Sequence, residues 1–369
     1  MDGLAWKIFA GLFGPVVLLA VLMAAWEVEQ EVAQKDALLR LAVDSVVDVQ
    51  DAATAPPESE GCPVFVQGEA NAQLPIRDAA FGVTLLCIRM QRHFEFYQWQ
   101  ETRTEKTQRR GEGANEYTIE VFSYHKLWVE KPIDSVGFHE SEGHRNAPVA
   151  IEQRSVATHS NSVRLCGFLL NETEVAGIGE LQPYSPQADM IPPELAGNAV
   201  VHGGYLYVGA KGKPDPEHPQ IGDARISWSY VPNGARAAVL ACRRSDTLVP
   251  YMDKLDIVHS GSYKDAQDFI SREKSDSLWS NVGSFLMVLL LVTCTLRWLM
   301  VLAWDSPFWR RTEESGKWKL ALFLGAEITL LVFACAWMPT HTKVGLCTLL
   351  LCFPIFHFYR SYRRRFLSE

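Results

Sequence analysis

The residues most suggestive of chemistry are His139, Glu140 and His144, whose order resembles the metal-binding helix of a zinc protease. That helix needs two histidines four positions apart, on one face, with the glutamate as general base. Here the histidines are five positions apart, so a helix would turn one about 140° from the other. Gly143 also disfavours a helix. We therefore predict a polar loop and no metal site.

Two glycine-containing segments resemble phosphate-binding loops but lack essential residues. Gly177 and Gly179 have no third glycine, which a dinucleotide-binding turn requires, and Gly212-Lys213 is followed by Pro214 rather than Ser or Thr. The G-x-S-x-G turn of serine hydrolases does not occur in the sequence. We predict no catalytic residue, no cofactor and no nucleic-acid partner. An enzyme assembled from distant residues is the alternative, and it requires a pocket with perturbed ionisable groups.

One modification motif is present in the middle of the chain. Asn171, Glu172 and Thr173 form an N-glycosylation sequon, a motif that is used on the surface of secreted or luminal domains. Asn171 is therefore a glycosylation candidate if this segment enters a eukaryotic lumen. The alternative is a match that arises by chance.

Two ionisable residues, Arg297 and Glu327, lie inside apolar stretches of the sequence. Each is about 9–10 Å from the same end of its predicted helix, at 1.5 Å per residue. Charges within a membrane usually pair with one another or face a cavity. We predict an intramembrane Arg297–Glu327 pair. Separate snorkelling of each side chain to the interface is the alternative.

The cysteines fall into two groups. Four lie in the apolar C-terminal stretches, where thiols behave as small apolar groups: Cys294, Cys335, Cys347 and Cys352. The others lie in the middle of the chain: Cys62, Cys87, Cys166 and Cys242. An oxidising lumen would permit disulfides among this second group, in three possible full pairings. Buried free thiols are the alternative.

Long apolar stretches at both ends predict membrane spans, although the composition as a whole, 48% hydrophobic with a net charge of -8, resembles a soluble protein. A helix needs about 20 apolar residues to cross roughly 30 Å of hydrocarbon. Leu4–Trp26 has this length, and an uncleaved anchor fits it better than a signal peptide does. Three C-terminal spans are predicted at Val282–Ala303, Leu320–Met338 and Val344–Tyr359, of which the last is short and open to a re-entrant interpretation.

Basic residues predict the orientation of these spans. One cluster lies between the second and third spans: Arg310, Arg311, Lys317 and Lys319. Another follows the last span: Arg360, Arg363, Arg364 and Arg365. Short loops rich in Lys and Arg stay in the cytoplasm. Four spans then place both termini in the cytoplasm and residues 27–280 on the opposite side of the membrane.

The middle of the chain predicts antiparallel strands. Ile88–Trp99 and Tyr117–Glu130 alternate in polarity around a polar turn at Arg109–Ala114, which predicts a long hairpin. A second hairpin is predicted from Ala224 to Cys242, because its Asn233-Gly234 pair suits a type I′ turn. Two further single strands are predicted at Val163–Leu170 and Val200–Gly209.

Aromatic side chains share one side of the predicted long hairpin: Tyr97, Trp99, Tyr124 and Trp128. We call these four residues the aromatic face. Aromatic residues are enriched at protein interfaces, so the aromatic face is our candidate interaction surface. Burial under a predicted helix, Glu27–Ala53, is the alternative.

The predicted fold is an α+β membrane protein with an antiparallel β-rich extracytoplasmic domain and transmembrane α-helices, one N-terminal and three C-terminal. Six regions follow one another along the chain: a transmembrane anchor (1–26), a helical stalk or strap (27–60), a luminal β-rich domain (61–262), a helix leading into the membrane (263–281), transmembrane helices (282–359) and a basic cytoplasmic tail (360–369). Ser262, with Asp265, is the predicted N-cap of the fourth region.

The sequence resembles the transmembrane protein 43 family, also called LUMA, over nearly the whole chain. Met90–Glu101 resembles the family's aromatic strand with its Tyr-Gln-Trp core, and Phe138–Pro148 resembles its Gly-His-x-Asn-Pro segment, with Ala147 inserted before the proline. Gly222–Ser227 is similar to its Gly-Asp-x-Arg strand start. Leu248–Pro250 resembles a following family turn, whereas Glu327 has no family counterpart.

The resemblance implies a protein of the endoplasmic reticulum membrane and nuclear inner membrane, or of the cell membrane if the source is bacterial. It also implies nuclear envelope organisation, self-association, and emerin and lamins as partners. Our leading hypothesis is a non-enzymatic membrane organiser that acts through protein–protein interaction. The alternative is a channel or transport component, with Arg297 and Glu327 in a polar intramembrane path.

Overall fold

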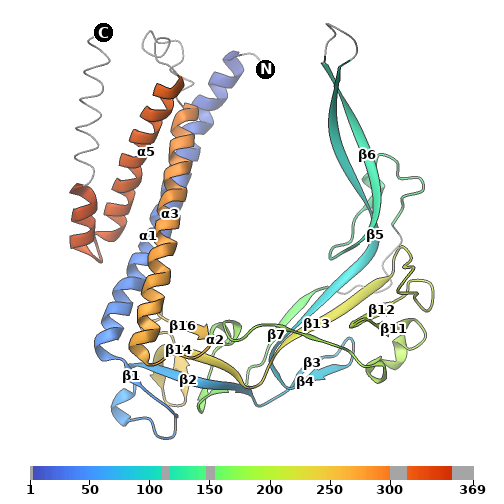
Figure 1. The fold of residues 1–369 in the computed structure, drawn as a ribbon, viewed down its shortest axis with the longest axis horizontal. Helices are drawn as coiled ribbons and strands as arrows, with labels where there is room; N and C mark the ends of the chain where they lie inside the picture. The colour runs from blue at the N-terminus through green and yellow to red at the C-terminus, as the bar shows by residue number, and fades with distance from the viewer. Residues whose placement is uncertain (1–2, 110–115, 147–153, 300–313, 351–369) are drawn as a thin grey trace. The chain divides into compact units, whose positions relative to one another are not determined.

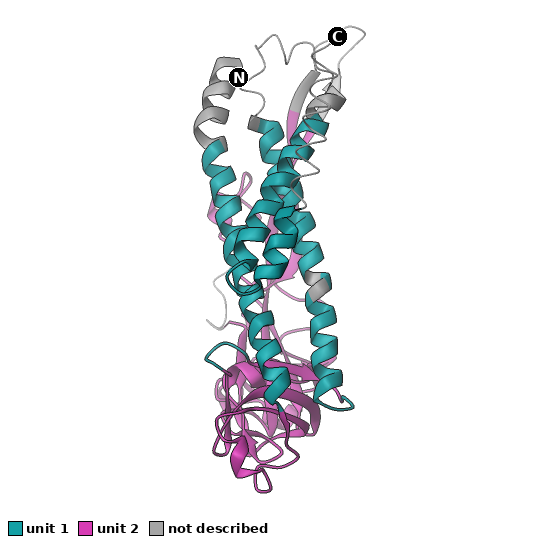
Figure 2. Ribbon diagram, turned by 90° about the vertical axis from the view of Figure 1, so that its left-hand side faces the viewer, with its two compact units in different colours: residues 1–46, 252–255, 263–369 teal, residues 47–251, 256–262 magenta. Residues whose placement is uncertain are grey.

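The computed structural model describes residues 3–109, 116–146, 154–299 and 314–350 (Figure 1). The chain forms two compact units (Figure 2). Unit 1 comprises residues 1–46, 252–255 and 263–369 and is mostly helical where it is described, whereas unit 2 comprises residues 47–251 and 256–262 and is mostly β. The mixture of helices with many antiparallel strands confirms that part of the predicted fold class.

Unit 1 is built from α1 (Gly3–Ser45), α3 (Ala266–Leu299), α5 (Glu314–Trp337) and a further helical stretch at 342–350. In the described part of the chain, two helical segments are long and apolar enough to cross a membrane, Ala266–Trp298 and Trp318–Trp337. They overlap the predicted second and third spans, Val282–Ala303 and Leu320–Met338, although residues 300–303 lie outside the described part of the chain. The predicted first span lies within α1. The fourth span beyond residue 350, and the basic tail, lie outside the described residues.

The first predicted helix end is wrong. α1 ends at Ser45 rather than at Ala53, because the chain leaves the helix at Val46 and begins β1 (Val47–Asp48) at the next residue. β1 pairs in parallel with β2 (Pro63–Ala72). Adjacent β-branched residues favour an extended strand over a helix, so the local sequence supports this ending.

The start of α3 also differs from the prediction. α3 begins at Ala266, so its N-cap is Asp265 rather than Ser262. The Asp265 Oδ1 atom accepts a hydrogen bond from the Asp268 amide at 2.8 Å, which satisfies one of the free donors of the first turn. Ser262 instead accepts a hydrogen bond from Arg236 at 3.3 Å.

The helices of unit 1 pack closely at small residues. A Cβ atom at Gly325 of α5 would lie 2.5 Å from Thr293 Oγ1 and 3.3 Å from Thr293 Cα, on α3. Glycine therefore permits this close approach of two helices, as is common in membranes. Ala25 of α1 is buried in a cluster with Val288 and Val292 of α3. The three helices thus share one apolar contact region.

The first sheet of unit 2 closes on itself. Its strand order is β1-β2-β8-β9-β15-β14-β16, and β2 also pairs with β14, so the strands from β2 to β14 complete a ring. Its core includes Val66, Leu165, Phe168 and Val239, all buried. The strands not yet given are β8 (Val163–Leu165), β9 (Phe168–Leu169), β14 (Ala235–Arg244), β15 (Thr247–Val249) and β16 (Ile257–Ser260).

The second sheet of unit 2 carries the long hairpin. Its order is β11-β12-β13-β5-β6, with β10 also paired to β13 and β7 to β5. Its strands are β5 (Cys87–Arg109), β6 (Glu116–Val129), β7 (Val156–His159), β10 (Gln182–Tyr184), β11 (Ala199–His202), β12 (Tyr205–Val208) and β13 (Ala224–Pro232). A separate small sheet pairs β3 (Ile76–Asp78) with β4 (Val83–Leu85), and α2 is a single short helix (Glu172–Ala176). The predicted long hairpin is confirmed as β5 and β6.

A buried polar contact connects the small β3–β4 sheet to the second sheet. Asp78 accepts hydrogen bonds from Arg92 Nη1 at 2.7 Å and from Trp228 Nε1 at 2.9 Å. Trp228 is 1% exposed and packs edge-on against the ring of Phe81. Because a buried carboxylate needs such donors, this arrangement orients the core side chains of β5 and β13.

The Asn233-Gly234 pair does not form the predicted hairpin. β13 and β14 flank it but belong to different sheets, with β13 bonded to β5, β10 and β12, and β14 bonded to β2, β15 and β16. Asn233 instead binds the Ala72 backbone at the end of β2, with Oδ1 accepting at 3.0 Å and Nδ2 donating at 3.1 Å. The positive φ of Gly234, +82°, allows the chain to change sheet at this corner.

The two predicted single strands are each a tight hairpin. β8 and β9 are joined by Cys166-Gly167, and β11 and β12 by Gly203-Gly204. All four turn residues have positive φ, which is the type I′ conformation. The predictions were right that these residues form strands but missed the two-residue turn inside each range.

Candidate interaction surface

The β5–β6 ribbon extends from the second sheet as a pair of strands (Figure 1). The two strands pair without a register shift from Phe96↔Val129 to Arg109↔Glu116. β13 and β7 pair with β5 only at residues 87–96. Within the described residues, β5 from Tyr97 onward therefore has only β6 as a strand partner, and β6 has only β5. We call residues 97–109 and 116–129 the ribbon.

The structure places the whole aromatic face on one side of the ribbon. Tyr97 is directly opposite Trp128, and Trp99 and Tyr124 occupy positions of the same parity on their strands. Directly opposed residues of an antiparallel pair project from the same side of the sheet. All four side chains are half-buried.

The inner end of the aromatic face packs against the second sheet. The rings of Tyr97 and Trp128 lie 5.2 Å apart, and Trp128 meets Tyr207 edge-on at 5.9 Å. The Arg225 guanidinium lies 4.7 Å from the centre of the Trp128 ring. Glu95 accepts two hydrogen bonds from Arg225, at 2.7 and 3.0 Å, which hold the cation over the ring.

The outer end is contacted by residues 134–146, which follow β6. The His144 ring stacks on Tyr124 at 3.8 Å and meets Trp99 edge-on at 4.8 Å. His139 stacks on Phe122 at 4.2 Å. These histidines therefore pack against the ribbon, and in the described part of the chain no three His, Cys, Asp or Glu side chains gather as metal ligands would.

Tyr124 also makes two polar contacts at this end. Its hydroxyl donates to Glu101 Oε2 at 2.7 Å and accepts from the Glu140 amide at 2.8 Å. Loss of hydration, followed by the hydrogen bond to Glu101, raises the pKa of Tyr124 above its usual value. The contacts fix the phenol ring in the aromatic face at neutral pH.

The backbone of β5 shows which groups of the ribbon face outward. Tyr97 N donates to Asp223 O at 2.8 Å, and Trp99 N donates to Asn146 Oδ1 at 2.7 Å. Both amides therefore point away from β6. Because backbone direction alternates along an antiparallel pair, every second residue of β6, including Lys126 and Glu120, also directs its N–H and C=O groups away from β5.

Asn171 lies at the start of α2 in unit 2. Its Oδ1 accepts from the Glu174 amide at 2.9 Å, while Glu174 Oε2 accepts from the Asn171 amide at 2.7 Å, a reciprocal capping box. Asn171 Nδ2, the atom that a glycan would modify, donates to Asp256 Oδ2 at 3.0 Å. Modification of Asn171 stays a prediction.

Arg297 and Glu327 lie on α3 and α5 of unit 1. The Arg297 guanidinium is 5.6 Å from the centre of the Trp318 ring. Glu327 Oε1 is buried and accepts no hydrogen bond from the described residues. The predicted ion pair between Arg297 and Glu327 stays a prediction.

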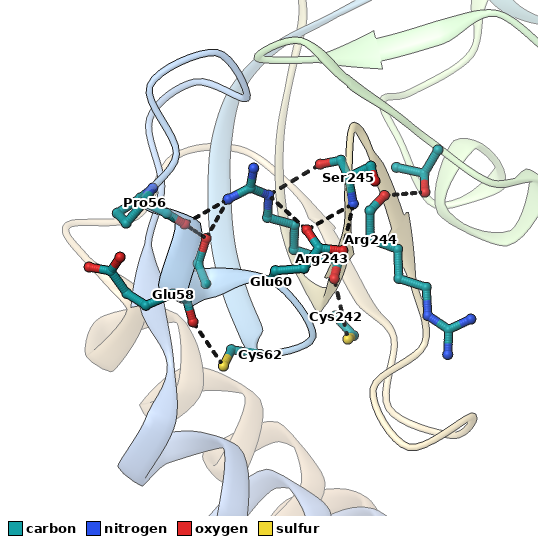
Figure 3. Close-up of polar contacts among 10 residues, drawn as sticks. Pro56, Glu58, Glu60, Cys62, Cys242, Arg243, Arg244 and Ser245 are labelled. Carbon is teal, nitrogen blue, oxygen red and sulfur yellow. Dashed lines mark hydrogen bonds and ion pairs between the residues drawn. The ribbon is translucent and has the colours of Figure 1, made fainter.

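The four cysteines of unit 2 are free thiols. Cys62 directly precedes β2, and Cys242 of β14 pairs with the next residue, Pro63. Cys62 donates to Glu58 O at 3.4 Å, and Cys242 donates to Arg243 O at 3.7 Å (Figure 3). Burial raises the pKa of Cys87 to about 11. Of the two alternatives that the sequence left open for these four residues, the structure therefore has free thiols.

Sequence reasoning missed two buried carboxylates. Glu29 is 0% exposed, and it accepts hydrogen bonds from Trp337 Nε1 and Ser284 Oγ, each at 3.1 Å. Glu174 is also 0% exposed, and burial together with the nearby Asp256 charge raises its pKa to about 8. The only feature of the sequence that could have pointed to Glu29 is its position just after the apolar stretch that ends at Trp26.

A family model described as Transmembrane protein 43 matches residues 96–341, which is more than half of the chain. The chain belongs to the transmembrane protein 43 family. This match includes the ribbon, both sheets of unit 2 in large part, and the two membrane-length helical segments. Family membership and the two apolar segments together show that this chain is a membrane protein.

Curated members of the transmembrane protein 43 family align over most of the chain. Transmembrane protein 43 of Rattus norvegicus is 26% identical over 82% of this chain and 77% of its own length. The Homo sapiens protein is 26% identical over 76% of this chain and 72% of its own length. A Drosophila melanogaster protein described as a transmembrane protein 43 homolog is 24% identical over 79% of this chain and 78% of its own length. No solved structure matches the chain.

Proposed function

We propose that this member of the transmembrane protein 43 family is a non-enzymatic, multi-pass membrane organiser that associates with itself and with protein partners through the ribbon. Four spans would place unit 2 on the extracytoplasmic side, in the endoplasmic reticulum membrane and nuclear inner membrane. Emerin and lamins are the partners suggested by family resemblance. The family is named for a transmembrane protein rather than for an enzymatic activity.

The observation that supports this proposal is the unpaired outer edge of β6. Glu116–Val129 has a strand partner on one side only, among the residues that the structure describes. A strand edge presents a row of N–H and C=O groups that another strand can bind, and isolated two-stranded ribbons are only marginally stable. A second copy of β6 in antiparallel register would satisfy these groups on both chains.

The ribbon carries two directly opposed glutamates with one arginine beside them. Arg103 forms ion pairs with Glu120, its diagonal neighbour on β6, and with Glu105 at 3.7 Å on its own strand. Glu105 and Glu120 are directly opposed. Like charges in this position cost stability unless a cation lies between them, so a partner that supplies a further cation would stabilise the ribbon.

Proline substitution at an outward-facing amide tests edge pairing. Glu120→Pro removes one edge donor, whereas Glu120→Ala removes the same carboxylate and keeps the donor. Proline at an edge position whose N–H faces solvent is compatible with the strand. We expect the full-length chain in nanodiscs or mild detergent to self-associate, Glu120→Pro to weaken the association, and Glu120→Ala to preserve it.

Mass photometry over a concentration series measures this difference, and hydrogen exchange of the β5 amides checks that the ribbon stays folded. A monomeric wild-type chain at every concentration would contradict the self-association. Equal association by Glu120→Pro with an intact ribbon would show that β6 is not the contact.

A further inference from the structure

Unit 1 contains a cavity of about 440 Å³ where α1, α3, α5 and the stretch 342–350 meet. Its walls come from the same end of each apolar segment. Glu29 follows the predicted first span, Asn281 directly precedes the second, and Trp337 is the last residue of α5. At that level hydrocarbon gives way to lipid headgroups, and tryptophan is enriched there. The cavity therefore lies where a headgroup would be.

The cavity wall carries balanced charge. Arg40 and Lys274 supply two cations, and Glu29 and Asp36 supply two carboxylates. Asp36 accepts a hydrogen bond from Arg40 Nε at 2.9 Å and lies 3.1 Å from His341 Nε2. Guanidinium and ammonium groups bind phosphate, whereas carboxylates bind ammonium. A ligand with one phosphate and one amine matches this wall better than a purely anionic ligand does.

Glu29 is the most buried of the charged residues that line the cavity, at 0% exposed. Both of its oxygens accept hydrogen bonds, from Ser284 of α3 and Trp337 of α5, each at 3.1 Å. This buried carboxylate connects three helices, so the charged wall has a rigid support. Its carboxyl oxygens are hydrogen-bond acceptors, which suit the amine of a bound ligand.

The remaining wall is apolar. Phe333 of α5 and Val344 of the stretch 342–350 line the cavity, and Val344 is 40% exposed. In a bilayer this exposed side faces acyl chains. We propose that the cavity binds a zwitterionic phospholipid with a primary amine, whose phosphate contacts Arg40 and Lys274, whose amine lies toward Glu29 and Asp36, and whose chains pass Phe333 and Val344.

Native mass spectrometry tests the site. The full-length chain in detergent is mixed with defined lipids, the detergent is removed in the instrument, and the lipid that stays bound is measured. The lipids are phosphatidylethanolamine, phosphatidylglycerol, and soluble glycerophosphoethanolamine, which has the headgroup without acyl chains. We expect preferential retention of phosphatidylethanolamine. Losing one charged phosphate contact weakens binding about tenfold, so Lys274→Gln and Arg40→Gln should each reduce retention by about this factor.

Arg272→Gln is the matched control, because Arg272 is an exposed cation on the same helix as Lys274 and pairs with Asp268 outside the cavity. It should retain the lipid as the wild type does. Equal retention of phosphatidylglycerol would overturn the assignment of an amine. Equal binding of glycerophosphoethanolamine would overturn the assignment of a membrane lipid, and unchanged retention by Lys274→Gln would overturn the site.

A second measurement uses the unmodified chain and so does not depend on folding of a variant. We expect acetylation of Lys274 by a water-soluble reagent to be slower in bilayers containing phosphatidylethanolamine than in bilayers of phosphatidylglycerol. Lys343, an exposed lysine that does not line the cavity, serves as the internal reference. Equal protection of Lys274 in both bilayers would contradict the proposal.

Discussion

Asn146 binds both backbone groups of Trp99, since its Oδ1 accepts from the Trp99 amide at 2.7 Å and its Nδ2 donates to the Trp99 carbonyl at 3.0 Å. The side chain takes the place of a neighbouring strand at the edge of β5. Asn146 Nδ2 also donates to Ile133 O at 3.2 Å, and the Asn146 backbone amide donates to Ser135 Oγ at 2.8 Å. Residues 134–146 are thereby held against the aromatic face.

Asn146→Ala should release this segment from the ribbon. Loss of the two Trp99 contacts should cost about 1–2 kcal/mol of local stability, because a backbone donor and acceptor lose their partner. Hydrogen exchange at Trp99 should accelerate, and the stacking of His144 on Tyr124 should weaken. Asn198→Ala, at an exposed asparagine elsewhere in unit 2, should leave Trp99 exchange unchanged. Slow exchange at Trp99 in Asn146→Ala would refute the role of Asn146.

Glu174 predicts a pH dependence for unit 2. Its pKa of about 8 in the fold, against an ordinary value of 4.5, means that the folded state binds a proton more tightly than the unfolded state. The stabilisation is complete below pH 4.5 and is lost as the pH rises through about 8. For one proton, the free energy of unfolding should fall by up to about 1.4 kcal/mol per pH unit across this window.

Glu174→Gln should flatten this dependence, because glutamine keeps the oxygen that caps Asn171 and carries no charge beside Asp256. Denaturant unfolding of the full-length chain in detergent, at pH 5 and pH 8, measures the difference. Glu172→Gln, at an exposed neighbour whose side chain is 86% accessible, is the control and should keep the wild-type slope. If the free energy of unfolding of Glu174→Gln depended on pH as strongly as that of the wild type, this carboxyl group would be excluded as the source of the dependence.

Gly325 and Gly283 offer a matched pair of glycines on the membrane-length helices. A Cβ atom at Gly325 would meet Thr293 Oγ1 at 2.5 Å, whereas a Cβ atom at Gly283 has no neighbour within 4 Å. Gly325→Ala should destabilise the α3–α5 pair by about 1–3 kcal/mol through overpacking. Gly283→Ala should be neutral or stabilise by up to about 1 kcal/mol, from helix propensity. Thermal unfolding in detergent compares them, and equal melting temperatures would contradict the packing argument.

The predicted Arg297–Glu327 pair is tested by a double-mutant cycle. If the two side chains interact, Arg297→Gln and Glu327→Gln should be non-additive, with a coupling of about 1 kcal/mol for a polar contact between membrane helices. Unfolding in bilayers or mild detergent measures each variant. Additive effects would support separate contacts for the two residues, such as that of Arg297 with the Trp318 ring.

Glycosylation at Asn171 is tested by separating the sequon from the helix cap. Thr173→Ala removes the sequon and keeps the Asn171 cap, whereas Asn171→Gln removes both. If the site is used, both variants should lose the mobility shift that a glycosidase abolishes. Asn171→Gln alone should also lower stability, by about 1 kcal/mol. A wild-type chain made in microsomes that shows no shift would exclude the modification.

Local patterns along the sequence determined several elements of this protein. Alternation in polarity over Ile88–Trp99 and Tyr117–Glu130 is sufficient to predict β5 and β6, because side chains of a strand point to opposite faces in turn. The same alternation placed Tyr97, Trp99, Tyr124 and Trp128 on one side. Two apolar runs near the C-terminus likewise predicted helices of membrane length, since that property depends only on composition and length.

The tertiary structure alone decided which elements meet. Asn233-Gly234 has the local chemistry of a hairpin turn, yet β13 and β14 enter different sheets, because β14 is buried among β2, β15 and β16, which are distant in sequence. The buried contact between Glu29 and Trp337 joins residues 308 positions apart. Periodicity reports the environment of each segment but not its partner, so contacts between distant segments follow only from the packed fold.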